Sequence, residues 1–254
     1  MADEARSPQP SGVGRFTELR QVVLVGGCPK GHEEPFDPST LSGKRLRALL
    51  AKTGLQDAKL IDLWKTEEEE LKGTIDQTII SQIDQWIKQG VLVWSLGRWV
   101  QSRLAASGII TGYLPHPASR RPQDLLGLER GLRRLARQRW PKLGRIWFTR
   151  QMREAILAGR KTATTRDHQK GLGDWLAVGG SYFSADPFAV ITITENSEST
   201  WEHSLENFRA EGFESLEGMH RFAYETGLDR YAKAPHLYFH RFEVVLTANG
   251  AERP

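Results

Sequence analysis

The amino-terminal part of the chain repeats one pattern, in which a short apolar run is followed by a stretch with helical spacing. The four apolar runs are QVVLVGGCP at 21–29, AKLIDLW at 58–64, VLVWSLG at 91–97 and IITGYLPHP at 109–117. Strands that alternate with helices favour a parallel sheet covered on both faces. Ligands of such sheets bind beyond the carboxyl ends of the strands, which here carry the segments GGCPKG, DLWKT, LGRW and PHPAS.

The pattern changes after Trp140 and Pro141. The segment 146–160 has the spacing of one amphipathic helix, with Phe148, Met152 and Ile156 on a shared face. Runs rich in threonine and valine follow and are typical of strands, namely KTATTR, DWLAVG, SYFS, FAVITITE and LYFHRFEVVLTA. A further helix is expected over 204–227.

These patterns predict an α/β chain in three parts. A flexible tail at 1–19 precedes a parallel α/β/α sandwich at 20–139, and an α+β domain with a small barrel-like sheet follows at 140–250. Hydrophobic residues make up 39% of the chain and charged residues 26%, which indicates packed domains and not a disordered chain.

The charge and the cysteine content of the sequence indicate which binding partners and which cellular compartment to expect. The formal net charge is +4, and basic residues concentrate between 130 and 153. Such a cluster either neutralises phosphates or forms a solvated helix face. Cys28 is the single cysteine, which excludes an internal disulfide and suits a reducing compartment. With no apolar run of transmembrane length and no signal-peptide pattern at the start, the sequence predicts a cytoplasmic protein without a membrane partner.

Neither a metal nor another cofactor is predicted. The strongest metal candidate is HLYFH, where His236 and His240 would share one face of a strand. At the rise of a strand they would lie roughly 13 Å apart, which is too far for one zinc ion.

The carboxy-terminal half carries a series of motifs in one order: ILAGRKTATTRD, GDWLAVG, FAVITITE, NFRAEGFESLEGMHRF and HLYFHRFEVV. This series resembles the ASCH domain, which has a PUA-like fold. The resemblance implies binding of RNA or other nucleic acid in a cleft of the barrel. GRKTATTRD is closest to the N4-acetylcytidine amidohydrolase branch, and that likeness assigns a catalytic set to Lys161, Thr164 and Glu211.

The chemistry of this set is reasonable on physical grounds. A threonine hydroxyl needs a base to become a nucleophile, and a partly desolvated lysine with a lowered pKa can serve. In a regular strand, Lys161 and Thr164 would point to opposite faces, so the set requires a turn near Lys161, which Gly159 permits. The alternative is a site that binds a ligand without chemistry, with Arg166 on the same strand paired to Asp167.

The amino-terminal half carries GGCP at 26–29 and HPAS at 116–119. Together with the strand and helix in VLVWSLGRWVQSRL, these motifs resemble the uracil-DNA glycosylase superfamily. The resemblance implies that Phe36 stacks on a base, that Asp62 reads it, and that His116 and Ser119 contact it. The sequence departs from the family pattern at Gly27 and Cys28, because neither residue can hold water or stabilise a cation as a carboxylate does.

The predicted function is recognition or processing of a modified nucleobase in a nucleic acid or nucleoside. The sharpest enzymatic form is hydrolysis of an N4-acylated cytosine. The alternatives are a non-catalytic reader of RNA or DNA, and N-glycosylase activity in the first domain. Phosphate contacts are assigned to Arg133, Arg134 and Arg137. The base, the polymer and the oligomeric state stay open.

Overall fold

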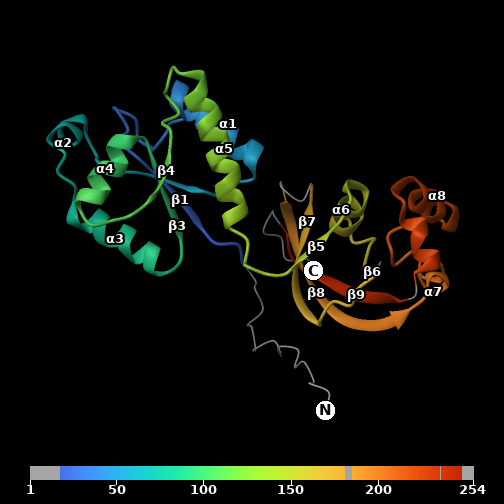
Figure 1. Ribbon diagram of the computed structural model, residues 1–254. Helices are drawn as coiled ribbons and strands as arrows, with labels where there is room; N and C mark the ends of the chain where they lie inside the picture. The colour runs from blue at the N-terminus through green and yellow to red at the C-terminus, as the bar shows by residue number, and fades with distance from the viewer. Residues whose placement is uncertain (1–17, 181–184, 235, 248–254) are drawn as a thin grey trace, which may run out of the picture. The chain divides into compact units, whose positions relative to one another are not determined.

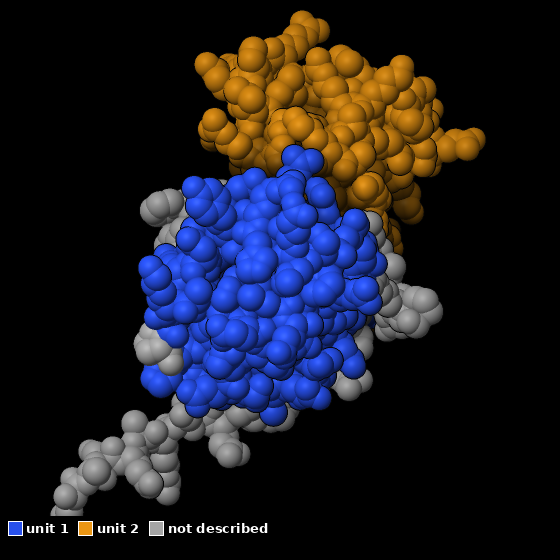
Figure 2. All heavy atoms as spheres, turned by 90° about the vertical axis from the view of Figure 1, so that its right-hand side faces the viewer, with its two compact units in different colours: residues 1–18, 142–254 blue, residues 19–141 orange. Residues whose placement is uncertain are grey.

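The computed structural model describes residues 18–180, 185–234 and 236–247. These residues form two compact units, which divide between Pro141 and Lys142 and are coloured separately in Figure 2. The predicted strand SYFS at 181–184 lies outside the described residues. None of the described helices is long and apolar enough to cross a membrane.

The first unit, Leu19–Pro141, contains a four-stranded sheet in the order β2-β1-β3-β4. All of its strand pairs are parallel, so the predicted parallel α/β sheet is confirmed. The strands are β1 (Val22–Gly26), β2 (Lys59–Asp62), β3 (Leu92–Leu96) and β4 (Gly112–Leu114). Every residue of β1 is buried, because β1 has a neighbour on each side and helices on each face.

Four helices cover this sheet (Figure 1): α1 (Leu41–Thr53), α3 (Gln77–Lys88), α4 (Arg98–Ala106) and α5 (Pro122–Gln138). The short helix α2 (Glu67–Lys72) follows β2 and buries none of its residues. Side chains of β1 alternate between two cores, as the pleat requires. Val22 and Leu24 pack with α1 and α5, while Val23 and Val25 pack with α3 and α4. The strand order reverses direction at β1, and the carboxyl end of β1 is therefore the expected ligand edge.

The second unit contains a five-stranded sheet in the order β5-β7-β8-β9-β6. The strands are β5 (Arg145–Trp147), β6 (Ala163–Arg166), β7 (Gly173–Gly179), β8 (Asp186–Ser199) and β9 (Leu237–Thr247). Pairing is antiparallel except between β5 and β7. The register of β8 with β9 shifts at two places, and such bulges bend a sheet. The sheet curls into a half barrel (Figure 1), which agrees with the small barrel-like sheet predicted for this half.

The helices of the second unit differ from the prediction in two places. They are α6 (Arg150–Leu157), α7 (Trp201–Glu206) and α8 (Leu216–Thr226), followed by the 3₁₀ helix η2 (Leu228–Lys233). The predicted helix over 146–160 begins too early, because Ile146 pairs with β7 and the Thr149 hydroxyl caps α6 by accepting from the Met152 N–H. Phe148 therefore lies before the helix and not on its face.

The predicted single helix over 204–227 is also wrong. Residues 207–215 break it into α7 and α8, and a short bridge pairs Lys161 with Glu211 inside this break. Gly212, inside this break, has a φ of 94°, which an L-residue rarely adopts and which does not fit a right-handed helix. The break brings the backbone of Glu211 beside Lys161.

Candidate functional site

A cavity of about 100 Å³ opens in the second unit. Its apolar wall is mostly aromatic and includes Trp147, Phe148, Trp201, Phe213, Phe222 and Tyr231. Its polar lining is Lys161, Thr164, Thr165, Arg166 and Glu211. A pocket with flat apolar walls and a few polar groups suits one planar polar ring.

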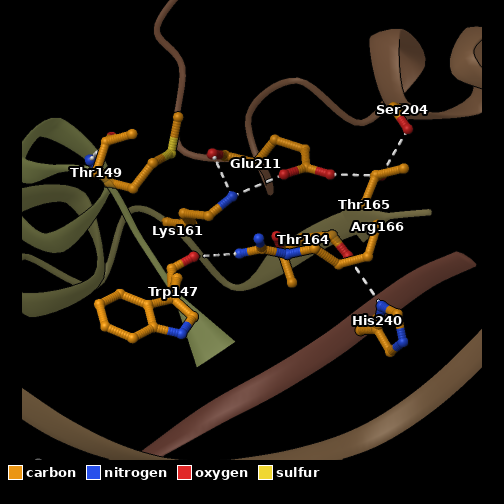
Figure 3. Close-up of polar contacts among 10 residues, drawn as sticks. Trp147, Thr149, Lys161, Thr164, Thr165, Arg166, Ser204, Glu211 and His240 are labelled. Atoms are coloured by element: carbon orange, nitrogen blue, oxygen red, sulfur yellow. Dashed lines mark hydrogen bonds and ion pairs between the residues drawn. The ribbon is translucent and has the colours of Figure 1, made fainter. Parts of the chain in front are cut away.

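Lys161 and Glu211 form a buried ion pair in this cavity. The Lys161 Nζ donates to Glu211 Oε2 at 2.7 Å and to the Glu211 carbonyl at 2.9 Å (Figure 3). Only 2% of the Lys161 side chain and 7% of the Glu211 side chain are exposed. The turn that the sequence required occurs here, since Gly159 has a φ of 73° and β6 begins after Lys161.

Backbone contacts hold the two residues together. The N–H groups of Thr162 and Ala163 both donate to the Ala210 carbonyl, at 2.8 and 2.9 Å. A Cβ placed on Gly212 would lie 2.8 Å from the Lys161 Cβ. The close approach of the two segments therefore requires glycine at this position.

Burial and the ion pair act on both pKa values. Burial lowers the pKa of Lys161, and the nearby Glu211 carboxylate opposes this effect without reversing it. For Glu211, burial raises the pKa, but Lys161 and the Thr165 hydroxyl outweigh burial and hold it below its usual range. Glu211 is thus an anion, and Lys161 releases its proton more readily than an exposed lysine does.

The threonine bonded to Glu211 is Thr165, one residue beyond the predicted Thr164. The Thr165 hydroxyl donates to Glu211 Oε1 at 2.7 Å and shares a 2.6 Å hydrogen bond with Ser204. Sequence reasoning missed both Thr165 and Ser204. The alternation of side chains along KTATTR was a usable signal for Thr165, whereas nothing in the sequence pointed to Ser204.

Thr164 is buried and lines the same cavity. The Thr164 carbonyl lies 3.2 Å from His240 Nδ1, and His240 Nε2 accepts from the Lys170 N–H at 2.9 Å. A ring nitrogen that accepts carries no proton, so His240 is neutral with its proton on Nδ1. Burial also lowers the pKa of His240. This histidine fixes the strand that carries Thr164.

Arg166 lies deep in the cavity wall. Its Nη2 donates to the Trp147 carbonyl at 2.7 Å, and its guanidinium stacks 5.0 Å from the Phe148 ring centre. Its Nε is buried and has no hydrogen-bond partner among the described residues. The predicted ion pair with Asp167 is wrong, because Asp167 lies in the bend after β6 and contacts His168 at 2.6 Å.

The first unit has its own cavity, of about 300 Å³, beyond the carboxyl ends of β1 and β2. Phe36, Asp62 and His116 line it, and the Phe36 and His116 rings lie 5.9 Å apart between centres. Ser119 does not line the cavity; its hydroxyl donates to Asp124 at 2.6 Å. Glu70 and Lys30 do line it, and the sequence analysis did not identify either.

Two titratable side chains that line this cavity, Asp62 and His116, have shifted pKa values. Burial, assisted by the Glu70 carboxylate, raises the pKa of Asp62 to about 6. Asp62 Oδ2 is buried and has no partner among the described residues. His116 Nδ1 accepts from the Ala118 N–H at 3.1 Å, and burial together with Lys30 lowers the pKa of His116. The ring proton of His116 is therefore on Nε2.

The basic segment 130–153 is divided between the two units, because residues up to Pro141 belong to the first and residues from Lys142 to the second. Arg133, Arg134 and Arg137 are exposed on α5, but Arg133 pairs with Glu129 at 2.9 Å. Arg139 is buried and ion-paired with Asp57. The number of unpaired positive charges on α5 and the residue that follows it is therefore smaller than the number of arginines there.

Across the residues that the structure describes, no group of three or more histidine, cysteine, aspartate or glutamate side chains is arranged to hold a metal ion.

The chain matches no protein-family model and no curated protein. Part of it is similar to two solved structures. One is an ASCH domain from Lactobacillus crispatus, with 18% identity, a TM-score of 0.28, and coverage of 37% of this chain and 70% of that one. The other is a DUF984-family protein from Enterococcus faecalis, with 19% identity, a TM-score of 0.29, and coverage of 43% and 84%.

Proposed function

We propose that the second unit binds a single acylated cytosine-type base in its cavity and hydrolyses the exocyclic amide. One observation carries the proposal: a buried Lys161–Glu211 ion pair lines the same aromatic cavity as Thr164. The desolvation cost of a buried ion pair often exceeds the attraction between its charges, so packing alone would favour apolar side chains at these two positions. The aromatic walls suit the face of a base, and stacking is worth about 1–3 kcal/mol per base.

The residues divide the chemistry among them. In its uncharged form, which the lowered pKa of Lys161 makes accessible, the Lys161 amine takes the proton of the Thr164 hydroxyl as that oxygen attacks the acyl carbon. The unpartnered Nε of Arg166 supplies a donor to the carbonyl oxygen as negative charge develops. The C–N bond then breaks, the amine leaves with a proton from Lys161, and water hydrolyses the threonine ester to release the acid.

Glu211 orients Lys161 and is itself held by Thr165 and Ser204. This chain of hydrogen bonds fixes the position of the Lys161 nitrogen before substrate arrives, and such preorganisation lowers the reorganisation needed in the transition state. Thr165 and Ser204 are thus positioning residues, and the substrate contacts belong to Lys161, Thr164 and Arg166.

Turnover of N4-acetylcytidine, free and within an oligonucleotide, tests the proposal by mass spectrometry. Thr164→Val keeps the shape and removes the nucleophile, so turnover should fall by at least about 10²-fold while binding is retained. Thr162→Val is the matched control, because Thr162 is exposed on the same segment. Binding of the base without any turnover would replace hydrolysis with a non-catalytic reader of the modified base.

A second candidate function belongs to the first unit, namely hydrolysis of an N-glycosidic bond. The supporting observation is the cavity in which Asp62 stays protonated to about pH 6 beside the Phe36 and His116 rings. An acid that keeps its proton can donate to a leaving base. Cleavage of uracil-containing DNA that survives His116→Ala would exclude a catalytic role for this histidine.

A further inference from the structure

We propose that Glu70 supplies the carboxylate that faces the sugar carbon of an N-glycoside bound in the first unit, and that it activates the attacking water. The proposal rests on the second candidate function above. It assigns the water-activating carboxylate to a residue more than forty positions after the GGCP motif, because Gly27 and Cys28 of that motif have no carboxylate.

The orientation of Glu70 separates it from its neighbours on α2. This helix carries four consecutive glutamates, and Glu67, Glu68 and Glu69 are exposed. Glu70 is half-buried and lines the cavity that also contains Asp62 and His116. Successive side chains of a helix point about 100° apart, so four consecutive glutamates cannot share one solvated face, and Glu70 is the one that faces the cavity.

Gly27 makes room for this carboxylate. A Cβ placed on Gly27 would lie 2.7 Å from Glu70 Oε1, so any side chain at position 27 would displace Glu70. Cys28 holds the other oxygen, since its Sγ donates to Glu70 Oε2 at 2.8 Å. The Glu70 carboxylate therefore occupies the space that a side chain of the GGCP motif would take.

The segment that carries Glu70 is tied to the end of β1. The N–H groups of Leu63 and Trp64 donate to the Gly27 carbonyl at 2.9 and 3.0 Å. The Trp64 indole then donates to the Thr74 carbonyl at 2.9 Å, which closes the loop around α2. Because Trp64 is almost fully buried, this arrangement gives Glu70 a fixed position at the ligand edge.

Asp62 and Glu70 line the same cavity, and two carboxyl groups so placed can divide the roles of acid and base between them. The Glu70 carboxylate takes a proton from water, and the water oxygen bonds to the sugar carbon as the C–N bond breaks. The electron pair of that bond goes to the leaving base, which receives the proton of Asp62. The products are the free base and the sugar hemiacetal, and the site is restored when solvent takes the proton from Glu70 and supplies one to Asp62.

Cleavage assays test the catalytic step. Labelled oligonucleotides with one uracil or one hypoxanthine are incubated with the full chain, and abasic sites are cleaved and counted. Glu70→Gln should lower the rate by about 10²–10⁴-fold, the usual contribution of a general base. Glu67→Gln, on the same helix but exposed, should leave the rate unchanged. In a Glu70→Ala background, Gly27→Asp should restore part of the rate by returning a carboxylate to the same space.

A binding assay separates the placement of Glu70 from the activity. An oligonucleotide with a cationic pyrrolidine in place of one sugar is compared with one that carries a neutral tetrahydrofuran. The unaltered protein should prefer the cation by about tenfold or more, as expected for a charge-assisted contact. The preference should vanish in Glu70→Gln and persist in Glu67→Gln.

The two assays fail in different ways. Preference for the cation without cleavage of any oligonucleotide removes glycosidic hydrolysis from the proposed function and supports the placement of Glu70. Equal binding of both oligonucleotides by the unaltered protein, or a preference that survives Glu70→Gln, overturns the assignment of Glu70.

Discussion

Removing one partner of the Lys161–Glu211 pair should destabilise the second unit far more than removing both. Lys161→Met leaves a buried carboxylate with the Thr165 hydroxyl as its remaining donor, and Glu211→Leu leaves a buried ammonium bonded to one carbonyl. Each single change should cost about 3–5 kcal/mol of unfolding free energy, because it leaves an uncompensated buried charge. The double variant replaces the pair with apolar side chains and should lie within about 1 kcal/mol of the unaltered protein.

The magnitude follows from burial. The Lys161 and Glu211 side chains are 2% and 7% exposed, whereas the Arg221–Glu217 pair on α8 is 67% and 84% exposed. Arg221→Met is therefore the matched control and should cost less than about 0.5 kcal/mol, as for other surface pairs. The two pairs differ mainly in access to water, so the contrast isolates the effect of burial.

Native-state hydrogen exchange measures this prediction for the second unit alone. Amides of β8 and β9 lie in the centre of its sheet and should open only with unfolding of the unit. The double variant should keep their protection and still fail to turn over N4-acetylcytidine, which separates stability from function. A double variant whose loss equals the sum of the two single losses would refute the reasoning, because the two charges would then act independently.

Three further predictions concern a glycine, a carboxyl group and the basic helix. Gly212→Ala should cost about 1–3 kcal/mol in urea unfolding, because a Cβ would lie 2.8 Å from the Lys161 Cβ at a φ of 94°; unchanged stability would contradict the close approach. Because burial raises the pKa of Asp62 from 3.8 to about 6, its contribution to first-unit stability is complete below pH 4 and is lost as the pH rises through 6. The loss should be about 1–3 kcal/mol, and Asp62→Asn should remove that part of the pH dependence. Replacing Arg133, Arg134 and Arg137 with alanine should reduce the salt slope of oligonucleotide binding by about 0.7–0.9 per lost phosphate contact, and an unchanged slope would mark a solvated face.

The parallel sheet of the first unit could be predicted because its signal is local. Each strand is a short apolar run bounded by glycine or polar residues, and each helix that follows has its own apolar spacing. Glycine and threonine also mark helix ends locally, as Thr40 and Gly54 do for α1. The strand runs and helix ends of this unit could be predicted because they depend on residues that are neighbours in the sequence.

The first and last residues of the helices around the cavity of the second unit could not be predicted in the same way. Residues 204–227 have continuous helical spacing, yet the chain breaks there because Lys161, about fifty positions away, bonds to the Glu211 carbonyl and carboxylate. A tertiary contact thus overrides a local preference. The same reason explains why Thr165, and not the predicted Thr164, is bonded to Glu211. The sequence of the strand does not show which of its two faces Glu211 contacts.

Both cavities obtain a carboxylate from a segment remote in sequence, and in each a glycine clears the space. Gly212 permits the close approach of Lys161 that places Glu211, and Gly27 leaves room for Glu70. The electrostatic outcomes are opposite. Glu211 faces a cation and stays ionised, whereas the charge of Glu70 helps to keep the proton on Asp62. A lysine that gives up its proton suits attack on an amide, and an acid that keeps its proton suits the departure of a base. Under the two proposed functions the units take different substrates, and a variant that inactivates one cavity should leave the reaction of the other unchanged.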